Sequence, residues 1–286
     1  MNEWLKLIFV NHRRQLRSGW KIGMILIIYL IGAAIWKYCF PNTFETDLGF
    51  FTIDSMILLG AIFSILKWVD RKQLSDIGFT NLNGNFWDLG FGLILGAVSM
   101  SIIFLVLAFT GQILVESSRF LSRNFSISLL NSLLLFILVG FREEIFSRGY
   151  CLFALRQMRR LWLAVLLSSL IFALLHLTTP YFNLISFVNI LIVGILFSFM
   201  VLQTGNLWMS IGYHITWNYF QGSIFGFPVS GQNFMGVYSI QIRNRNLLTG
   251  GLYGPEGGVL TTAVLLMGFV VVWLYTMGRA RERRLD

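Results

Sequence analysis

Long apolar runs recur along the whole chain and alternate with short polar connections. A run of about 17–25 residues is long enough to cross a bilayer as a helix. These runs must be helical, because lipid offers no partner for a free backbone group and the runs lack the alternation of barrel strands. The pattern predicts an all-α, polytopic transmembrane helical bundle of about eight spans, at residues 22–40, 50–66, 87–113, 131–155, 161–178, 184–202, 207–220 and 259–277.

The composition is also that of a membrane protein. Of the 286 residues, 56% are hydrophobic and only 12% are charged. Soluble domains contain about 25% charged residues. The lipid bilayer is therefore the first expected partner.

The net charge of +9 is distributed along the sequence as expected at a membrane surface. Basic and aromatic residues are not interleaved, so we expect no nucleic-acid partner. If the chain starts inside the cell, the external segments hold few cations, namely Lys37, Arg119, Arg123, Arg243 and Arg245. The positive-inside rule then predicts a multi-pass protein of the cell membrane, interpreted as a bacterial cytoplasmic membrane, with both termini in the cytoplasm.

Four segments outside the spans have distinct compositions. Residues 1–21 form a basic leader that is expected to lie on the inner membrane surface. Residues 67–90 are interpreted as a cytoplasmic loop with a turn at Asn83-Gly84, and residues 116–126 as a short external surface helix. The glycine-rich segment 221–258 is too long for a plain turn, and we interpret it as a lid over a cavity or as a loose external loop.

Two adjacent glutamates, Glu143 and Glu144, lie in the middle of the fourth run. A charged side chain at the centre of a bilayer costs about 3 kcal/mol on insertion scales, so such residues usually have a function. Glu144 and Arg148 are four residues apart and share one helical face, which predicts an ion pair. That pair would be structural, and it leaves Glu143 unexplained.

The remaining polar candidates follow in the same half of the chain, and we expect all buried ionisable groups to lie between residues 142 and 218. His176 and His214 lie inside apolar runs, where a lone histidine often only bonds two helices together. Asn218 follows His214 by four residues, so the two side chains share a face and could hold a developing oxyanion. Phe172 has the same spacing to His176, and we assign it a packing role. Because the histidines lie at different depths along their runs, a shared site requires tilted or broken helices.

Three ordered motifs in this region resemble those of a known family. Glu143-Glu144-Ile-Phe-Ser-Arg148 resembles an EExxxR motif, Phe172-Ala-Leu-Leu-His176 an FxxxH motif and His214-Ile-Thr-Trp-Asn218 an HxxxN motif. These are motifs of the CAAX protease and bacteriocin-processing (CPBP, Abi) family of intramembrane endopeptidases, which includes the type II CAAX prenyl proteases. The resemblance covers roughly residues 130–225. We therefore divide the single membrane domain into N-terminal spans and leader at 1–125 and a catalytic core at 126–286.

The resemblance implies an active site within the membrane that hydrolyses a peptide bond of a peptide or protein substrate. Glu143 is then the general base and His176 its partner on the attacking water. His214 and Asn218 are implied to stabilise the oxyanion, with Glu144, Arg148 and Phe172 in support. A role in peptide or bacteriocin maturation, or in self-immunity, is as compatible with the resemblance as cleavage of prenylated tails.

Three alternatives remain open from the sequence. A metal-free glutamate mechanism without cofactor is favoured, but His176 and His214 with Glu143 or Glu144 could also form a zinc set. The HExxH spacing that would make zinc a strong prediction is absent. A proton-coupled transporter could use the same glutamate and histidines as a relay. A non-catalytic membrane scaffold or immunity protein could retain the whole constellation.

Overall fold

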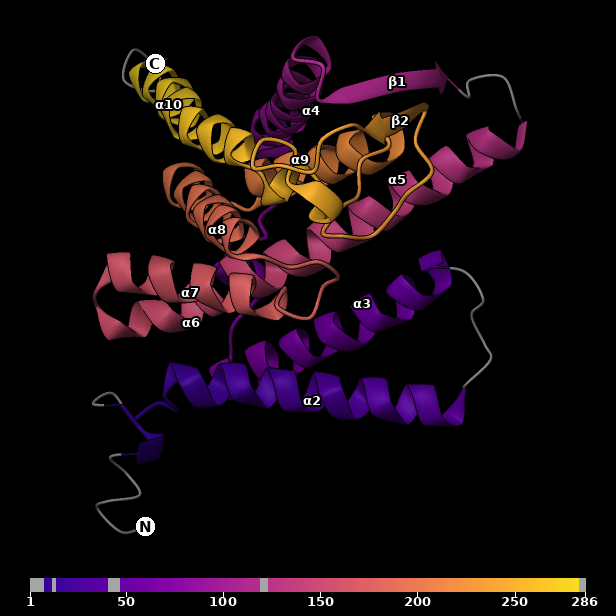
Figure 1. Cartoon of the computed structure of the whole chain (residues 1–286). Coiled ribbons are helices and arrows are strands. Elements are labelled where there is room, and N and C mark those ends of the chain that lie inside the picture. Colours follow the sequence, from indigo (N-terminus) through magenta and orange to yellow (C-terminus); the bar gives the residue numbers. More distant parts are fainter. Residues whose placement is uncertain (1–7, 12–13, 41–46, 119–122, 283–286) are drawn as a thin grey trace.

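The computed structural model describes residues 8–11, 14–40, 47–118 and 123–282. Helices dominate this part of the chain (Figure 1). They are α2 (Ser18–Cys39), α3 (Asp47–Ser64), α4 (Phe86–Phe109), α5 (Arg123–Glu144), α6 (Leu152–Leu155), α7 (Leu161–Leu175), α8 (Leu184–Thr204), α9 (Trp208–Tyr219) and α10 (Val259–Glu282). Three of them continue as π-helical turns: α3 over Ile65–Asp70, α5 over Ile145–Cys151 and α9 over Phe220–Ile224.

The helical bundle is that of a multi-pass membrane protein. Among the described residues, five helices are long and apolar enough to cross a bilayer: Ser18–Cys39, Leu48–Asp70, Phe86–Phe109, Leu184–Thr204 and Val259–Gly278. The helix Leu161–Leu175 is apolar but shorter. The sequence range 131–155 is also helical, through α5, the π-helical turn that follows it and α6, and most of the range 207–220 lies in α9. The total of eight spans stays a prediction.

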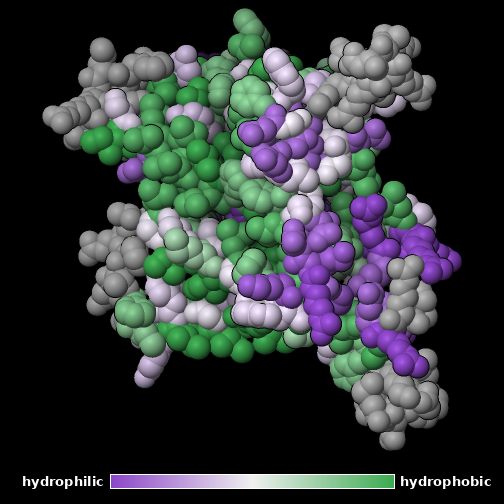
Figure 2. All heavy atoms as spheres, turned by 180° about the vertical axis from the view of Figure 1, so that it is seen from behind, coloured by the Kyte–Doolittle hydropathy of each residue, from purple (hydrophilic) through white to green (hydrophobic). Residues whose placement is uncertain are grey.

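The surface of the bundle fits this environment. Large apolar side chains are exposed on its outer helices, for example Leu30 at 62% on α2 and Ile94 at 65% on α4. Figure 2 shows hydrophobic side chains over much of one face, with hydrophilic side chains gathered along its right side. In Figure 1 the start of α2 and the end of α10 both lie on the left, as expected if they share a membrane side.

A two-stranded antiparallel ribbon corrects the all-α prediction. Strand β1 (Ile113–Ser118) pairs with β2 (Tyr238–Ile242), with Val115 opposite Ile240 and an irregularity between Val115 and Ser117. The third span was therefore predicted to end too late, at residue 113, because α4 ends at Phe109. The surface helix predicted at 116–126 was wrong where its first residues form the end of β1. The segment Ile113-Leu-Val can satisfy its backbone on the distant β2, and branched side chains suit a strand. Residues 119–122 lie outside the described part.

The predicted loop at 67–90 begins later than expected, because α3 continues to Asp70. The Asp70 side chain is 5% exposed and forms an ion pair with Lys21, and it accepts a hydrogen bond of 2.7 Å from the Tyr150 hydroxyl. These contacts hold the end of the helix inside the bundle. The turn predicted at Asn83-Gly84 lies in the short 3-10 helix Leu82–Gly84.

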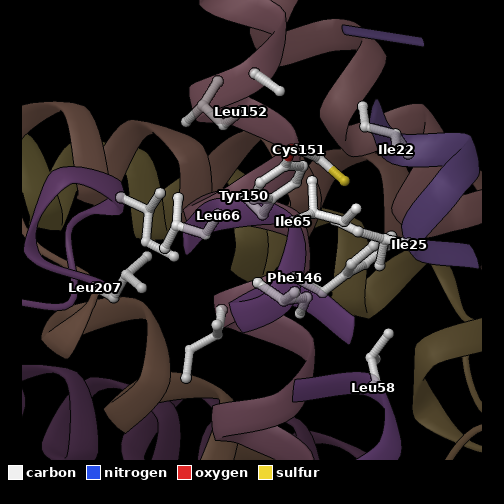
Figure 3. Packing of buried hydrophobic residues seen from close by; sticks show 14 of the residues in the cluster. Ile22, Ile25, Leu58, Ile65, Leu66, Phe146, Tyr150, Cys151, Leu152 and Leu207 are labelled. Carbon is white, nitrogen blue, oxygen red and sulfur yellow. The ribbon is translucent and has the colours of Figure 1, made fainter. Parts of the chain in front are cut away.

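Two hydrophobic clusters position the central helices. In the first, side chains of α2 and α3 pack on the π-helical turn that follows α5, with Ile25, Ile65, Phe146 and Tyr150 at its centre (Figure 3). The second joins α4, α8, α9 and α10. Helix α9 is buried along most of its length.

Small residues let α4 approach α9 closely. A Cβ atom on Gly92 would lie 2.1 Å from the Met209 carbonyl oxygen, and one on Gly96 would lie 2.4 Å from that of Tyr213. Such a contact between backbones requires glycine, as at many membrane helix interfaces. The approach fixes the position of α9, which carries two of the candidate site residues.

Candidate active site

The two glutamates lie where the α-helix changes to a π-helix. Helix α5 ends at Glu144, and the π-helical turn begins at Ile145. Turns of this kind are rare and frequently occur at functional sites. The buried side chains Phe146 and Tyr150 pack this turn against α2 and α3. The backbone that carries the glutamates is therefore held from behind.

Glu144 is fully buried at 0% exposure and joins two of the motifs. Its Oε1 atom accepts a hydrogen bond of 2.9 Å from Arg148 Nη1, so the ion pair predicted from their spacing is present. The same oxygen lies 3.1 Å from Nδ1 of His214 on α9. The Arg148 guanidinium lies over the Phe172 ring, 4.0 Å from its centroid. Phe172 thus packs on the ion pair as well as on the histidine.

Glu143 turns its carboxylate toward both histidines. Its Oε2 atom lies 3.9 Å from Nε2 of His176 and 3.8 Å from Nε2 of His214. These distances exceed a direct hydrogen bond but suit a bridging water. The Glu143 side chain is 19% exposed, whereas that of Glu144 is fully enclosed. Adjacent glutamates therefore occupy different environments.

The histidines present the same nitrogen to Glu143. His176 directly follows the last residue of α7, and its Nδ1 lies 2.8 Å from the Phe172 carbonyl oxygen. A carbonyl only accepts, so the proton is on Nδ1 and neutral His176 has a lone pair on Nε2. Nδ1 of His214 likewise faces an oxygen, Oε1 of Glu144, which already accepts a hydrogen bond from Arg148. With Nδ1 as the donor, each ring in its neutral form directs Nε2 as an acceptor at the Glu143 side of the site.

A cavity of about 310 Å³ unites these groups. It is lined by Glu143, His176, His214, Asn218 and Phe172, so all four residues assigned catalytic roles by resemblance meet one space. Both histidines line this cavity although His176 follows the end of α7 and His214 lies near the middle of α9. Apolar side chains of α2, α3 and α5 complete the wall, including Leu26, Leu58, Leu135, Phe136 and Val139.

The three motifs fall inside one family match. Residues 125–220 match the family described as Type II CAAX prenyl endopeptidase Rce1-like. This segment belongs to the CAAX protease family. The family implies a peptidase, and α2, α3, the ribbon and α10 lie outside the matched residues. No curated protein and no solved structure matches the chain.

The CAAX protease segment does not contain every polar group at the site. Asp54 on α3 forms an ion pair with Arg142 and accepts a hydrogen bond of 2.7 Å from the Tyr29 hydroxyl on α2. The expectation that buried ionisable groups lie only between residues 142 and 218 was therefore wrong, and Lys21 and Asp88 are buried too. The sequence alone could have indicated this residue, because Asp54 is an acid inside the apolar run 50–66.

The segment 221–258 packs over the cavity through its own polar contacts. Glu256 accepts a hydrogen bond of 2.7 Å from the Ser230 backbone N–H, and one of 3.4 Å from Trp217 Nε1 on α9. Asn189 on α8 donates to the backbone oxygens of Glu256 and Gly258. Burial and then the Glu256 carboxylate raise the pKa of the nearby Tyr253 phenol, which keeps its proton.

The glycines of this segment serve close packing. A Cβ atom on Gly250 would lie 1.9 Å from the Gly254 carbonyl oxygen, and one on Gly254 would lie 2.2 Å from that of Pro228. Both have positive φ angles, which glycine adopts without strain. Glycine content is therefore not by itself a sign of motion here. Movement of the segment as a lid stays a prediction.

The side chains named as possible zinc ligands do not lie at zinc-binding spacing in the described part of the chain. Among the residues that the structure describes, no three His, Cys, Asp or Glu side chains form a group that could hold a metal ion. Ligands of one tetrahedral zinc are roughly 3.3 Å apart, given metal–ligand distances near 2.0–2.1 Å. The pairs between Glu143 and the two histidines are wider, at 3.9 and 3.8 Å. Glu144 is engaged by Arg148 and His214 instead.

Proposed function

We propose that this protein is an intramembrane endopeptidase in which Glu143 activates a water molecule. The observation that carries the proposal is the convergence of Glu143, His176, His214 and Asn218, from three separate motifs, on one cavity in a bundle of apolar helices. A proton relay for transport needs carriers spaced along a path. These groups instead line one cavity together, which favours a catalytic site over a transport path.

Water activation follows from the orientation of the carboxylate. A water between Glu143 and His176 can donate one hydrogen to Oε2 and the other to the lone pair of Nε2, which are 3.9 Å apart. Its oxygen is then free to attack a peptide carbonyl carbon. Glu143 takes the proton as the carbon–oxygen bond forms, and returns it to the amine nitrogen as the carbon–nitrogen bond breaks.

Asn218 and His214 are the partners we propose for the tetrahedral oxygen. Both side chains lie on α9 and line the cavity. The Asn218 amide carries N–H donors at any pH. His214 gives its Nδ1–H to Glu144, so its Nε2 donates to the oxyanion only when the ring carries a second proton. Asn218 is therefore the constant donor of the pair.

The cavity wall indicates an apolar substrate segment. Apolar side chains of α2, α3 and α5 line one part, and the polar groups of α9 and the 221–258 segment line another. A pocket of this kind suits a peptide with a large apolar side chain or a lipid-modified residue near the cleaved bond. Both maturation of a membrane-bound peptide and cleavage of a prenylated tail would use it.

Two experiments test this function. Comparing the peptides of cells that carry the wild-type protein with those of cells that carry Glu143→Gln should reveal cleaved products that only the wild type makes. With such a peptide, Asn218→Ala should lower kcat by about 10²–10³-fold, the usual loss for one oxyanion donor, with KM nearly unchanged. Identical peptide profiles, or unchanged kcat in Asn218→Ala, would contradict the proposed function.

A further inference from the structure

A continuous chain of polar contacts leads from the N-terminal helices to Glu143. The Tyr29 hydroxyl on α2 donates to Asp54 Oδ1 on α3 at 2.7 Å. The other oxygen of Asp54 pairs with Arg142. Arg142 Nη2 then donates to Glu143 Oε1 at 3.3 Å. Tyr29 and Asp54 lie outside the family match at residues 125–220.

The residues in this series of polar contacts are largely shielded from solvent. The side chain of Asp54 is 8% exposed and that of Arg142 is 16% exposed. Arg142 also lies over the ring of Phe51 on α3, 5.7 Å from its centroid. Tyr29, Phe51 and Arg142 line the same cavity as Glu143. The guanidinium is therefore fixed on one side by α3 and on the other by the candidate base.

We propose that Arg142, held by Asp54 and Tyr29, is a positioning residue for Glu143. Arg142 engages Oε1, which leaves Oε2 as the oxygen that faces the Nε2 atoms of both histidines. The inference rests on the proposed function, since it explains how the general base keeps one oxygen toward the attacking water. It also makes α2 and α3 a part of the active site.

The physical reason is the freedom of a glutamate side chain. Its terminal torsion is broad and roughly two-fold, so an unrestrained carboxylate samples many orientations. A bond from a planar guanidinium that is itself paired removes much of this freedom. Reacting groups displaced by 1 Å can lose about 10²-fold in rate. Arg142 acts on the rate through Glu143, without touching the substrate bond.

Variants of the residues in this series of polar contacts test the proposal in the intact protein. We use the cleaved peptide from the comparison of cells, made as a quenched fluorescent substrate, and measure kcat and KM beside a melting curve. Arg142→Gln should lower kcat by about 10–10²-fold with little change in KM. Asp54→Asn should act in the same direction more weakly. Arg142→Lys retains a charged donor and should recover part of the loss.

A matched control separates positioning from general charge removal. Lys72 forms an exposed ion pair with Asp76 at 3.4 Å, outside the cavity. Lys72→Gln should leave kcat unchanged. If Arg142→Gln has wild-type kcat, or if Arg142→Lys restores the melting temperature but none of the lost kcat, Arg142 does not position the base.

A second readout needs no substrate. In a His12→Gln background, only His176 and His214 remain of the three histidines in the sequence, so their ring ¹⁵N signals can be recorded in detergent. Arg142→Gln should shift both Nε2 signals, because the carboxylate they face is released. Unchanged signals would overturn the positioning role. If no peptide is cleaved by the wild type but the signals shift, the proposed function fails and the positioning stands.

Discussion

Glu144→Gln should act on stability, because within the described part of the chain Glu144 is the carboxylate that forms an ion pair with the fully buried Arg148. The side chains of Glu144 and Arg148 are both 0% exposed, and Oε1 accepts from Arg148 at 2.9 Å and from His214 at 3.1 Å. An amide keeps the size of the side chain but removes the counter-charge. Breaking a buried pair in this way costs about 3–5 kcal/mol, since an uncompensated charge remains.

The assay is thermal unfolding of the purified protein in detergent. On the scale of soluble domains, the loss corresponds to a fall in Tm on the order of 10 °C. Glu116 on β1 is exposed, so Glu116→Gln is a matched control with an expected change within about 0.5 kcal/mol. The double variant Glu144→Gln with Arg148→Met should lose less than Glu144→Gln alone, because no buried charge is left unpaired.

The result that would refute this reasoning is a wild-type melting curve for Glu144→Gln. It would mean that the Arg148 guanidinium is satisfied without Glu144, for example by the Phe172 and Phe197 rings that lie 4.0 and 5.0 Å from it. A double variant less stable than Glu144→Gln would also contradict the argument. In either case the ion pair would not be what holds the motifs together.

Three further predictions concern packing, the segment over the cavity and topology. Gly96→Ala should lower Tm, since its Cβ would lie 2.4 Å from a backbone oxygen of α9; Gly90→Ala, with nothing within 4 Å, should not, and equal curves would contradict the close contact. Leu252→Cys, at a site 39% exposed, should change its labelling rate when a peptide inhibitor binds; a constant rate would remove the lid from the mechanism. Reporter fusions after Arg160 and after Asp286 should both report the cytoplasm, and one external result would mean a different number of spans.

Local spacing predicted the contacts that form within one helix. Glu144 and Arg148 are four residues apart and form their ion pair at 2.9 Å. His214 and Asn218 have the same spacing and line one cavity. The period of a helix determines such pairs without knowledge of the fold. The family motifs supplied the expectation that they share a site.

Contacts between distant segments could not be read in this way. The bond between Glu144 and His214 joins α5 to α9, and the pair of Asp54 with Arg142 joins α3 to α5. Both depend on which helices are neighbours, and hydrophobic periodicity does not specify neighbours. Strand β1 was missed for the same reason, because its partner β2 is more than a hundred residues away.

The glycine-rich segment shows how composition alone can mislead. Its glycines suggested a mobile lid, yet Gly250 and Gly254 lie where a Cβ would overlap a backbone oxygen. Glycine allows close approach as well as flexibility. Only the packed structure distinguishes the two uses at a given position.

The most direct test of the account is the turnover of a quenched peptide by Glu143→Gln beside the wild type. The glutamine keeps the size and hydrogen bonding of the side chain but cannot take a proton, so the rate should fall by about 10²–10⁴-fold. Its melting curve should stay close to that of the wild type, and a chelator should not alter wild-type turnover. Full activity in Glu143→Gln would contradict the central claim. Activity that is abolished by the chelator and restored by zinc would transfer water activation from Glu143 to a metal.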